Sequence, residues 1–126
     1  VPQHGDPVPS NLPGRVGEHV VAIDWSTLGI GPVGADLGYF ALSIRDDFES
    51  LVSSYVAALG PAVATRAEVE TGATITAVYT VLTRADWALA RVAEGDGALA
   101  GKFRHPAVAP YLRAMQRHLP QIESLL

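Results

Sequence analysis

The hydrophobic periodicity of this 126-residue chain changes at Asp36. Before that residue the sequence is punctuated by proline and glycine and contains one apolar run of strand length, at residues 20–23. From Asp36 onward, apolar residues recur about every 3.6 positions, as they do along one face of a helix. This change from strand-like to helical periodicity predicts a mainly α fold preceded by a small β-hairpin.

Turn residues set the expected limits of the hairpin and of the segment after it. Pro13, Gly14 and Gly17 mark the turn, and the second strand is expected to end at Asp24. Residues 26–34 contain three glycines and one proline, a composition that predicts a loop. The first helix is then expected to start at Asp36.

Two capping signals divide the helical part of the chain. Asp46 with Glu49, and Thr65 with Glu68, both have the spacing of a capping box. The first pair predicts a break between two helices, and the second of these should end at Gly60 and the following proline. The second pair predicts the start of a long helix.

The long helix is expected to stop near Gly95, with its first turns weakened by Gly72 and by the β-branched residues 74–76. A loop is expected over residues 95–105, and one or two short helices from Pro106 to Leu126. The apolar positions assigned to helix faces are Leu37, Phe40, Ala41, Ile44, Phe48, Leu51, Val52, Tyr55, Val56, Val69, Val78, Val81, Leu82, Ala85, Leu89 and Val92.

Composition limits the class of protein. Apolar residues make up 48% of the chain and charged residues 17%, which indicates one well-filled domain rather than a disordered chain. The net charge is −4 and the basic residues are scattered, so nucleic acid is not an expected partner. The chain has no cysteine and no apolar stretch long enough to cross a membrane, so we expect no membrane partner and a soluble, cytoplasmic protein.

Two acids and an amide lie close to the start of the chain. Asn11 follows Asp6 after four intervening residues, and Asp24 follows the apolar run. Phosphoryl transfer needs an acceptor for the proton of the substrate hydroxyl and oxygen ligands for magnesium. A single loop can present Asp6 to a substrate and the amide oxygen of Asn11 to a metal. Because a hairpin brings its ends together, Asp24 is expected beside Asn11, which completes a set of hard oxygen ligands.

Two segments around these residues resemble one family. Residues 4–11, HGDPVPSN, and residues 22–36, AIDWSTLGIGPVGAD, are similar to the catalytic loop and metal-binding segment of the aminoglycoside phosphotransferase and choline kinase-like family. These enzymes are relatives of the protein kinases and phosphorylate hydroxyl groups of small molecules. The resemblance covers residues 1 to about 40. It implies the C-terminal lobe of a protein kinase-like α+β fold, with ATP as co-substrate and Mg²⁺ as cofactor.

The resemblance also implies a role for each motif residue. Asp6 would be the catalytic base, Asn11 and Asp24 would bind magnesium and through it the nucleotide, His4 would brace the loop, and Asp36 would anchor the loop backbone from the next helix. The sequence departs from the family pattern at two positions in the first segment. Val8 stands where histidine is frequent, and Ser10 stands where glycine is usual.

Several side chains have a structural and a functional interpretation. His4 is a structural histidine or a base, and Asp36 is an anchor or N-cap or a metal ligand. Trp25 and Trp87 are packing residues or contacts for a substrate. The acidic side chains Glu70, Asp86, Glu94 and Glu123 belong to solvated helix faces or to a pocket for an amine-bearing substrate. The spacing of His19, His105 and His118 is not that of a zinc site.

The parts of a kinase that bind the nucleotide should precede the catalytic loop, and only three residues do so here. We therefore expect residues 1–126 to be the C-terminal lobe, inactive without the N-terminal nucleotide-binding lobe and prone to self-association when isolated. The first hypothesis is an ATP- and magnesium-dependent phosphotransferase acting on a hydroxyl of a small molecule, such as an aminoglycoside, amino alcohol or sugar. The second is a non-catalytic pseudoenzyme or helical binding module with the same fold.

Overall fold

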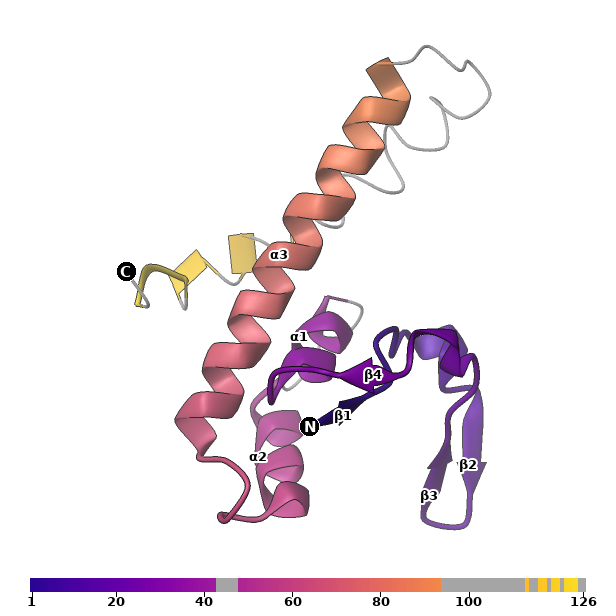
Figure 1. The fold of residues 1–126 in the computed structure, drawn as a ribbon, viewed down its shortest axis with the longest axis vertical. Helices are drawn as coiled ribbons and strands as arrows, with labels where there is room; N and C mark the ends of the chain where they lie inside the picture. The colour runs from indigo at the N-terminus through magenta and orange to yellow at the C-terminus, as the bar shows by residue number, and fades with distance from the viewer. Residues whose placement is uncertain (43–47, 94–112, 114–115, 118, 121, 125–126) are drawn as a thin grey trace. The chain divides into compact units, whose positions relative to one another are not determined.

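The computed structural model describes residues 1–42, 48–93, 113, 116–117, 119–120 and 122–124. Two compact units divide the chain, Val1–Thr76 and Ala77–Leu126, and their boundary falls within the longest helix. The described residues form three α-helices and two small antiparallel sheets (Figure 1). The expected mainly α architecture with a small β part is therefore confirmed.

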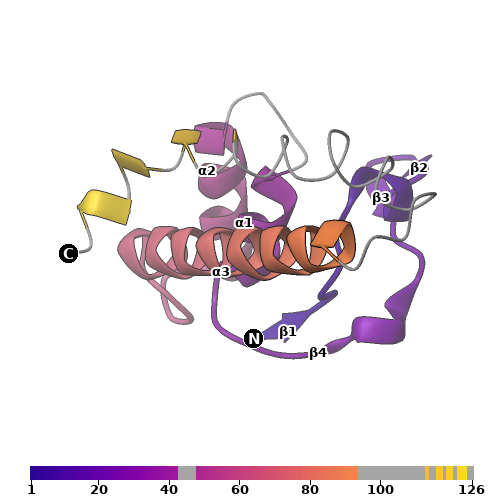
Figure 2. The same cartoon turned by 90° about the horizontal axis from the view of Figure 1, so that it is seen from above.

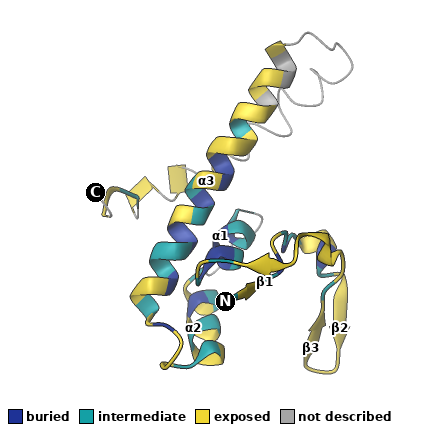
Figure 3. Ribbon diagram, viewed as in Figure 1, coloured by how far each residue is buried: buried dark blue, intermediate teal, exposed yellow. Residues whose placement is uncertain are grey.

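The predicted hairpin is present and is formed by β2 (Gly14–Val16) and β3 (His19–Val21), although Gly14 begins the first strand and does not lie in the turn as predicted. The pairing is antiparallel, with Arg15 opposite Val20. Gly17 lies in the turn with a φ of 61°, a value at which a side chain would add strain. The second strand ends at Val21, so it stops short of the predicted end at Asp24. Both strands are exposed throughout (Figure 3).

The second sheet was not predicted. β1 (Pro2–Gln3) pairs with β4 (Gly29–Ile30), and Figures 1 and 2 both show these two strands side by side. The prediction that residues 26–34 form only a loop is therefore wrong, because this segment contains β4 and part of a 3-10 turn, Trp25–Thr27. A strand of two residues has no detectable alternation, and its pairing depends on a partner far along the chain.

Helix α1 (Ala35–Ala41) starts at the predicted place. Gly34 precedes it with a φ of 83°, and its backbone N–H donates to the hydroxyl of Tyr55 at 3.3 Å. Tyr55 belongs to α2 (Phe48–Leu59), which ends as predicted at Gly60, where φ is 76°. The signal at Asp46 and the core position Ile44 lie outside the described residues.

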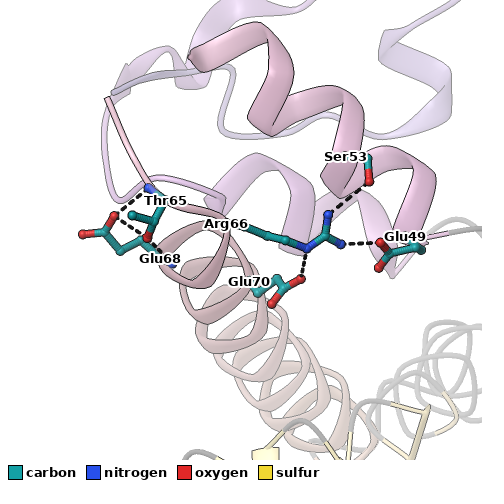
Figure 4. Close-up of polar contacts among 6 residues, drawn as sticks. All are labelled: Glu49, Ser53, Thr65, Arg66, Glu68 and Glu70. Atoms are coloured by element: carbon teal, nitrogen blue, oxygen red, sulfur yellow. Dashed lines mark hydrogen bonds and ion pairs between the residues drawn. The ribbon is translucent and has the colours of Figure 1, made fainter. Parts of the chain in front are cut away.

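Helix α3 (Arg66–Ala93) begins with the predicted capping box. The backbone N–H and the hydroxyl of Thr65 both donate to Glu68 Oε2 at 2.7 Å, and the N–H of Glu68 donates back to Thr65 Oγ1 at 3.3 Å (Figure 4). The expected loop at residues 95–105 lies outside the described residues. Between Pro106 and Leu126 only single residues and short runs are described, and most of these have helical backbone.

One arginine joins the start of α3 to α2. Arg66 forms ion pairs with Glu70 at 2.7 Å and with Glu49 at 2.5 Å, and it also donates to Ser53 Oγ at 3.1 Å (Figure 4). Glu49 and Ser53 belong to α2, whereas Glu70 is one turn along α3. The contacts to Glu49 and Ser53 therefore join the start of α3 to α2, whereas the pair with Glu70 lies within α3.

The buried core of the first unit is formed by Leu37, Val52, Ala64, Val69 and Ala73, and the partly buried Val33, Phe48, Leu51, Tyr55, Val56 and Leu59 pack against it. The segment around α1 packs directly on the α3 backbone. A Cβ at Gly34 would collide with the carbonyl of Val69, one at Gly38 with the carbonyl of Ala73, and one at Gly72 with the carbonyl of Val33. These glycines permit an approach that any larger residue would block. Gly72 therefore serves close packing, whereas the sequence indicated only a weakened helix.

The apolar stripe predicted for the second half of α3 is partly wrong. Leu82 and Leu89 are more than half exposed, at 53% and 58%, whereas the predicted Val81 is buried, as are Ala77 and Thr80, which were not predicted. Small residues occupy the buried face, and the prediction weighted side-chain size over the close approach that small residues allow. Trp87 is 45% exposed, so it is not a core residue. The described helices include none with the length and apolarity needed to span a membrane.

Candidate active site

The loop that carries Asp6 and Asn11 is held by its own side chains. A backbone bond from the N–H of Val8 to the carbonyl of Asp6, at 2.9 Å, turns the chain, and a 3-10 turn follows at Pro9–Asn11. The amide nitrogen of Asn11 donates to the carbonyl of Asp6 at 2.9 Å and to its carboxylate oxygen Oδ2 at 3.1 Å. Asn11 is buried, at 9% exposed, and Asp6 is partly exposed. The two residues predicted to act together are therefore in direct contact.

His4 is buried, at 6% exposed, and both of its ring nitrogens have partners. Nε2 lies 2.8 Å from the carbonyl of Ile23, and Nδ1 accepts the backbone N–H of Asp6 at 3.3 Å. The neutral ring with its proton on Nε2 satisfies both bonds. The ring of Trp25 packs on that of His4, with 4.5 Å between centroids. With both nitrogens occupied, His4 has the geometry of a brace rather than of a free base.

Asp36 reaches the same loop from the first turn of α1. Its carboxylate oxygen Oδ2 accepts the backbone N–H of His4 at 2.7 Å, and Oδ1 accepts the N–H of Gly5 at 3.0 Å. Gly5 has a φ of 83°, a conformation that favours glycine. Gly34, rather than Asp36, occupies the N-cap position of α1. These contacts are those that an anchoring role requires, and they occupy both carboxylate oxygens.

Asp24 follows the hairpin in the left-handed region, with φ 58° and ψ 62°, and no other non-glycine residue in the described part of the chain has a positive φ. Such backbone is costly for a residue other than glycine and is enriched at functional sites. The Asp24 side chain is exposed, and its Oδ1 accepts the hydroxyl of Ser26 at 2.7 Å. One residue earlier, the N–H of Ile23 donates to the carbonyl of Asn11 at 2.9 Å. This bond joins the segment before Asp24 to the loop that ends at Asn11.

Several contacts in this region were not found from the sequence. Ser26, Thr27 and the carbonyl of Ile23 all bond to motif residues, yet a hydroxyl or a carbonyl in a glycine-rich segment has no distinguishing pattern. Among the acidic residues considered for a pocket, Glu70 is ion-paired with Arg66 and Glu94 lies outside the described residues. The amine-binding pocket stays a prediction.

The donor atoms limit the kind of metal site this region can form. Within the described residues there is no group of three or more His, Cys, Asp or Glu side chains that could hold a metal ion. A cation here would therefore have at most two ligands of these types, with its other ligands supplied by other groups, by substrate and by water. Magnesium is often bound in that way, through one or two protein ligands and phosphate oxygens.

Protein kinases use an aspartate and an asparagine on one loop and a later aspartate for phosphoryl transfer, and the same residue types occur here in the same order. The sequence model of the phosphotransferase enzyme family matches residues 1–71, which is more than half of the chain and includes all five motif residues. The chain therefore belongs to the phosphotransferase enzyme family, and the predicted family membership is confirmed. No curated protein and no solved structure matches the chain.

Proposed function

We propose that residues 1–126 form the C-terminal lobe of an ATP- and magnesium-dependent small-molecule kinase with the protein kinase-like fold. The proposed enzyme transfers the γ-phosphoryl group of ATP to a hydroxyl of a small molecule. Family membership supports phosphotransferase activity in general. The observation that carries the finer proposal is the contact between Asp6 and Asn11, because it orients a partly exposed carboxylate through one of its two oxygens.

Asp6 is the proposed proton acceptor. Its Oδ2 is bonded to Asn11, so Oδ1 is the atom that can accept the substrate hydroxyl. The hydroxyl oxygen forms a bond to the γ-phosphorus, the bond from that phosphorus to the leaving oxygen of ADP breaks, and the hydroxyl proton passes to Asp6. His4 and Asp36 hold the loop backbone on either side of Gly5, which limits the movement of Asp6.

Asn11 and Asp24 are the proposed magnesium ligands. The amide nitrogen of Asn11 is committed to Asp6, which leaves the amide oxygen as the atom for a cation. Asp24 offers the hard carboxylate oxygen that Mg²⁺ prefers. Together these atoms fit a site completed by phosphate oxygens and water. When bound, magnesium neutralises charge on the transferring phosphate.

The proposal is tested with Asp6→Asn in the natural protein that contains these residues. The variant keeps an oxygen that can accept from Asn11, so folding should be unchanged while turnover falls at least about 100-fold, as expected for loss of a general base. Asp24→Ala should weaken binding of the magnesium–nucleotide complex, measured by calorimetry. The matched control for folding is Asp86→Asn, an exposed acid on α3. Full turnover of Asp6→Asn would refute the assignment.

The acceptor is identified by assaying ADP release with a panel of hydroxyl compounds. The panel contains aminoglycosides, choline-like amino alcohols and sugars, each at matched concentration. The expected result is release that depends on one class and disappears in Asp6→Asn. Release that persists in this variant would indicate another enzyme in the preparation or a different base.

We also propose that a nucleotide-binding lobe of the same protein covers the face around the hairpin. The support is the number of large exposed apolar side chains in the hairpin and in the segment that follows it: Val16, Val20, Val21, Ile23, Trp25, Leu28 and Ile30. The isolated chain should then self-associate in light scattering, whereas the natural protein should not. A monodisperse monomer of the isolated chain would contradict this.

A further inference from the structure

The backbone of His4 is hydrogen-bonded through both its N–H and its carbonyl. Its N–H donates to Asp36, and its carbonyl accepts the hydroxyl of Thr27 at 2.8 Å. Asp36 is part of the family motif, but Thr27 has no assigned role. Thr27 lies in the 3-10 turn Trp25–Thr27, more than twenty residues beyond the loop it contacts. Its hydroxyl therefore supplies a tertiary bond to the backbone two residues before Asp6.

Thr27 also contacts the next residue of the loop. A Cβ built on Gly5 would lie 2.6 Å from the carbonyl oxygen of Thr27 and 3.0 Å from its Cβ and Oγ1. Gly5 has a φ of 83°, so the chain turns in the left-handed region where it passes Thr27. The loop thus meets Thr27 by a hydrogen bond at His4 and by close packing at Gly5, immediately before Asp6.

The neighbour of Thr27 contacts the other proposed functional group. Ser26 Oγ donates to Oδ1 of Asp24 at 2.7 Å, at the residue with the strained backbone. A backbone bond from Leu28 to Trp25, at 3.1 Å, closes the turn that carries both hydroxyls. Two consecutive residues in one short turn therefore reach the proposed base loop and the proposed metal ligand.

We propose that Ser26 and Thr27 are paired positioning residues: Thr27 sets the position of the loop that carries Asp6, and Ser26 sets the orientation of the Asp24 carboxylate. The proposal rests on the function proposed above. It goes beyond that function because it assigns the spacing between proton acceptor and metal ligand to one turn, and it predicts separate effects for the two hydroxyls.

Thr27 is tested with Thr27→Val, which has nearly the same shape without the hydroxyl, and with Thr27→Ser, which restores it. Thr27→Val should lower kcat by about 5- to 10-fold, the scale of one lost hydrogen bond, with the KM for nucleotide unchanged. Thr27→Ser should recover most of kcat. Independently of activity, the backbone amide of Asp6 should exchange with solvent faster in Thr27→Val than in Thr27→Ser.

Ser26 is tested with Ser26→Ala. Binding of the magnesium–nucleotide complex, measured by calorimetry, should weaken about threefold, a smaller loss because the bond is exposed. The magnesium concentration for half-maximal rate should rise by the same factor, and kcat at saturating magnesium should be unchanged. Ser54→Ala, an exposed serine on α2, is the matched control.

The outcomes separate this inference from the proposed function. Activity retained in Asp6→Asn would remove the proposed function. Loss in Asp6→Asn together with an unchanged Thr27→Val would overturn only the role of Thr27, and unchanged metal binding in Ser26→Ala would overturn only that of Ser26. Equal losses in kcat and in metal binding in both variants, with a lowered Tm, would reduce the pair to a structural role and would also overturn the inference.

Discussion

The contact most open to a direct test is the anchor between α1 and the loop. Asp36 accepts two backbone N–H groups, from His4 at 2.7 Å and from Gly5 at 3.0 Å, one on each carboxylate oxygen. Asp36→Asn preserves the size of the side chain but replaces one oxygen with an NH₂ group. One N–H would then keep an acceptor without charge, and the other would face a donor.

The cost of this change follows from the two bonds. A hydrogen bond to a charged group contributes about 1.5–3 kcal/mol, and an unpaired buried donor costs about 1–3 kcal/mol. The full penalty does not apply here, because Gly5 is exposed and Asp36 is half-buried, so water can reach the freed N–H. We therefore expect Asp36→Asn to lower the free energy of unfolding by about 2 kcal/mol.

The measurement is urea denaturation followed by circular dichroism at 222 nm, on Asp36→Asn and on the control Asp86→Asn. Asp86 is exposed on α3, so its substitution should change stability by less than about 0.5 kcal/mol. A loss below that value for Asp36→Asn would refute the anchoring argument. Asp36→Asn should also lower kcat, since the loop before Asp6 loses a support.

Three further predictions concern the helices. Gly38→Ala places a methyl group against the carbonyl of the α3 backbone and should lower stability by about 1–3 kcal/mol in urea denaturation; a neutral effect would contradict the close packing. The hydrogen bonds from Thr65 lower the pKa of Glu68 below its ordinary value of 4.5. The difference in stability between wild type and Glu68→Gln should therefore be present near neutral pH and should vanish as the pH falls below 4.5 through the lowered pKa. A difference that persists in acid would count against the cap. Arg66→Met should lower stability by at most about 1 kcal/mol, because the ion pairs of Arg66 are partly exposed. High salt should reduce this difference in stability between wild type and variant. A larger loss that does not depend on salt would show that the pairing is not electrostatic.

Local signals in the sequence predicted the elements that depend on neighbours in the chain. The hairpin required only a glycine at its turn and an apolar strand after it. The start of α3 was predicted from Thr65 and Glu68 because a capping box is closed by residues three positions apart. The end of α2 was predicted from Gly60 because the left-handed conformation there favours glycine.

Contacts between distant segments were not predictable in the same way. Pairing of β1 with β4 depends on residues 2–3 meeting residues 29–30, and neither segment has the length or alternation of a strand. The exposed positions of Leu82 and Leu89 reflect the same limit. A helical stripe of large apolar residues indicates a packing face, but the face of α3 that is buried carries alanine and valine.

The candidate site shows the same difference between what local sequence signals predict and what depends on contacts between distant segments. The five motif residues were identified from residue type and spacing, and the structure brings Asp6 into contact with Asn11, and Asp36 into contact with the loop. The roles of these residues stay predictions. Ser26 and Thr27 could not be identified, because a hydroxyl becomes informative only when its partner is known, and the partner of Thr27 is a backbone carbonyl at His4.

The position of the loop depends in turn on small residues far from it in sequence. Asp36 can reach the loop only because α1 is held in place, and α1 is held where Gly38 lies against the α3 backbone and where Gly72 lies against Val33. A glycine costs a helix about 1 kcal/mol relative to alanine, so local propensity alone argues against Gly72 in α3. The close approach of the Val33 carbonyl to Gly72 explains a glycine at this position. Residues that weaken the helix in isolation thus set the distance between α3 and α1, and through Asp36 they set the position of the proposed catalytic loop.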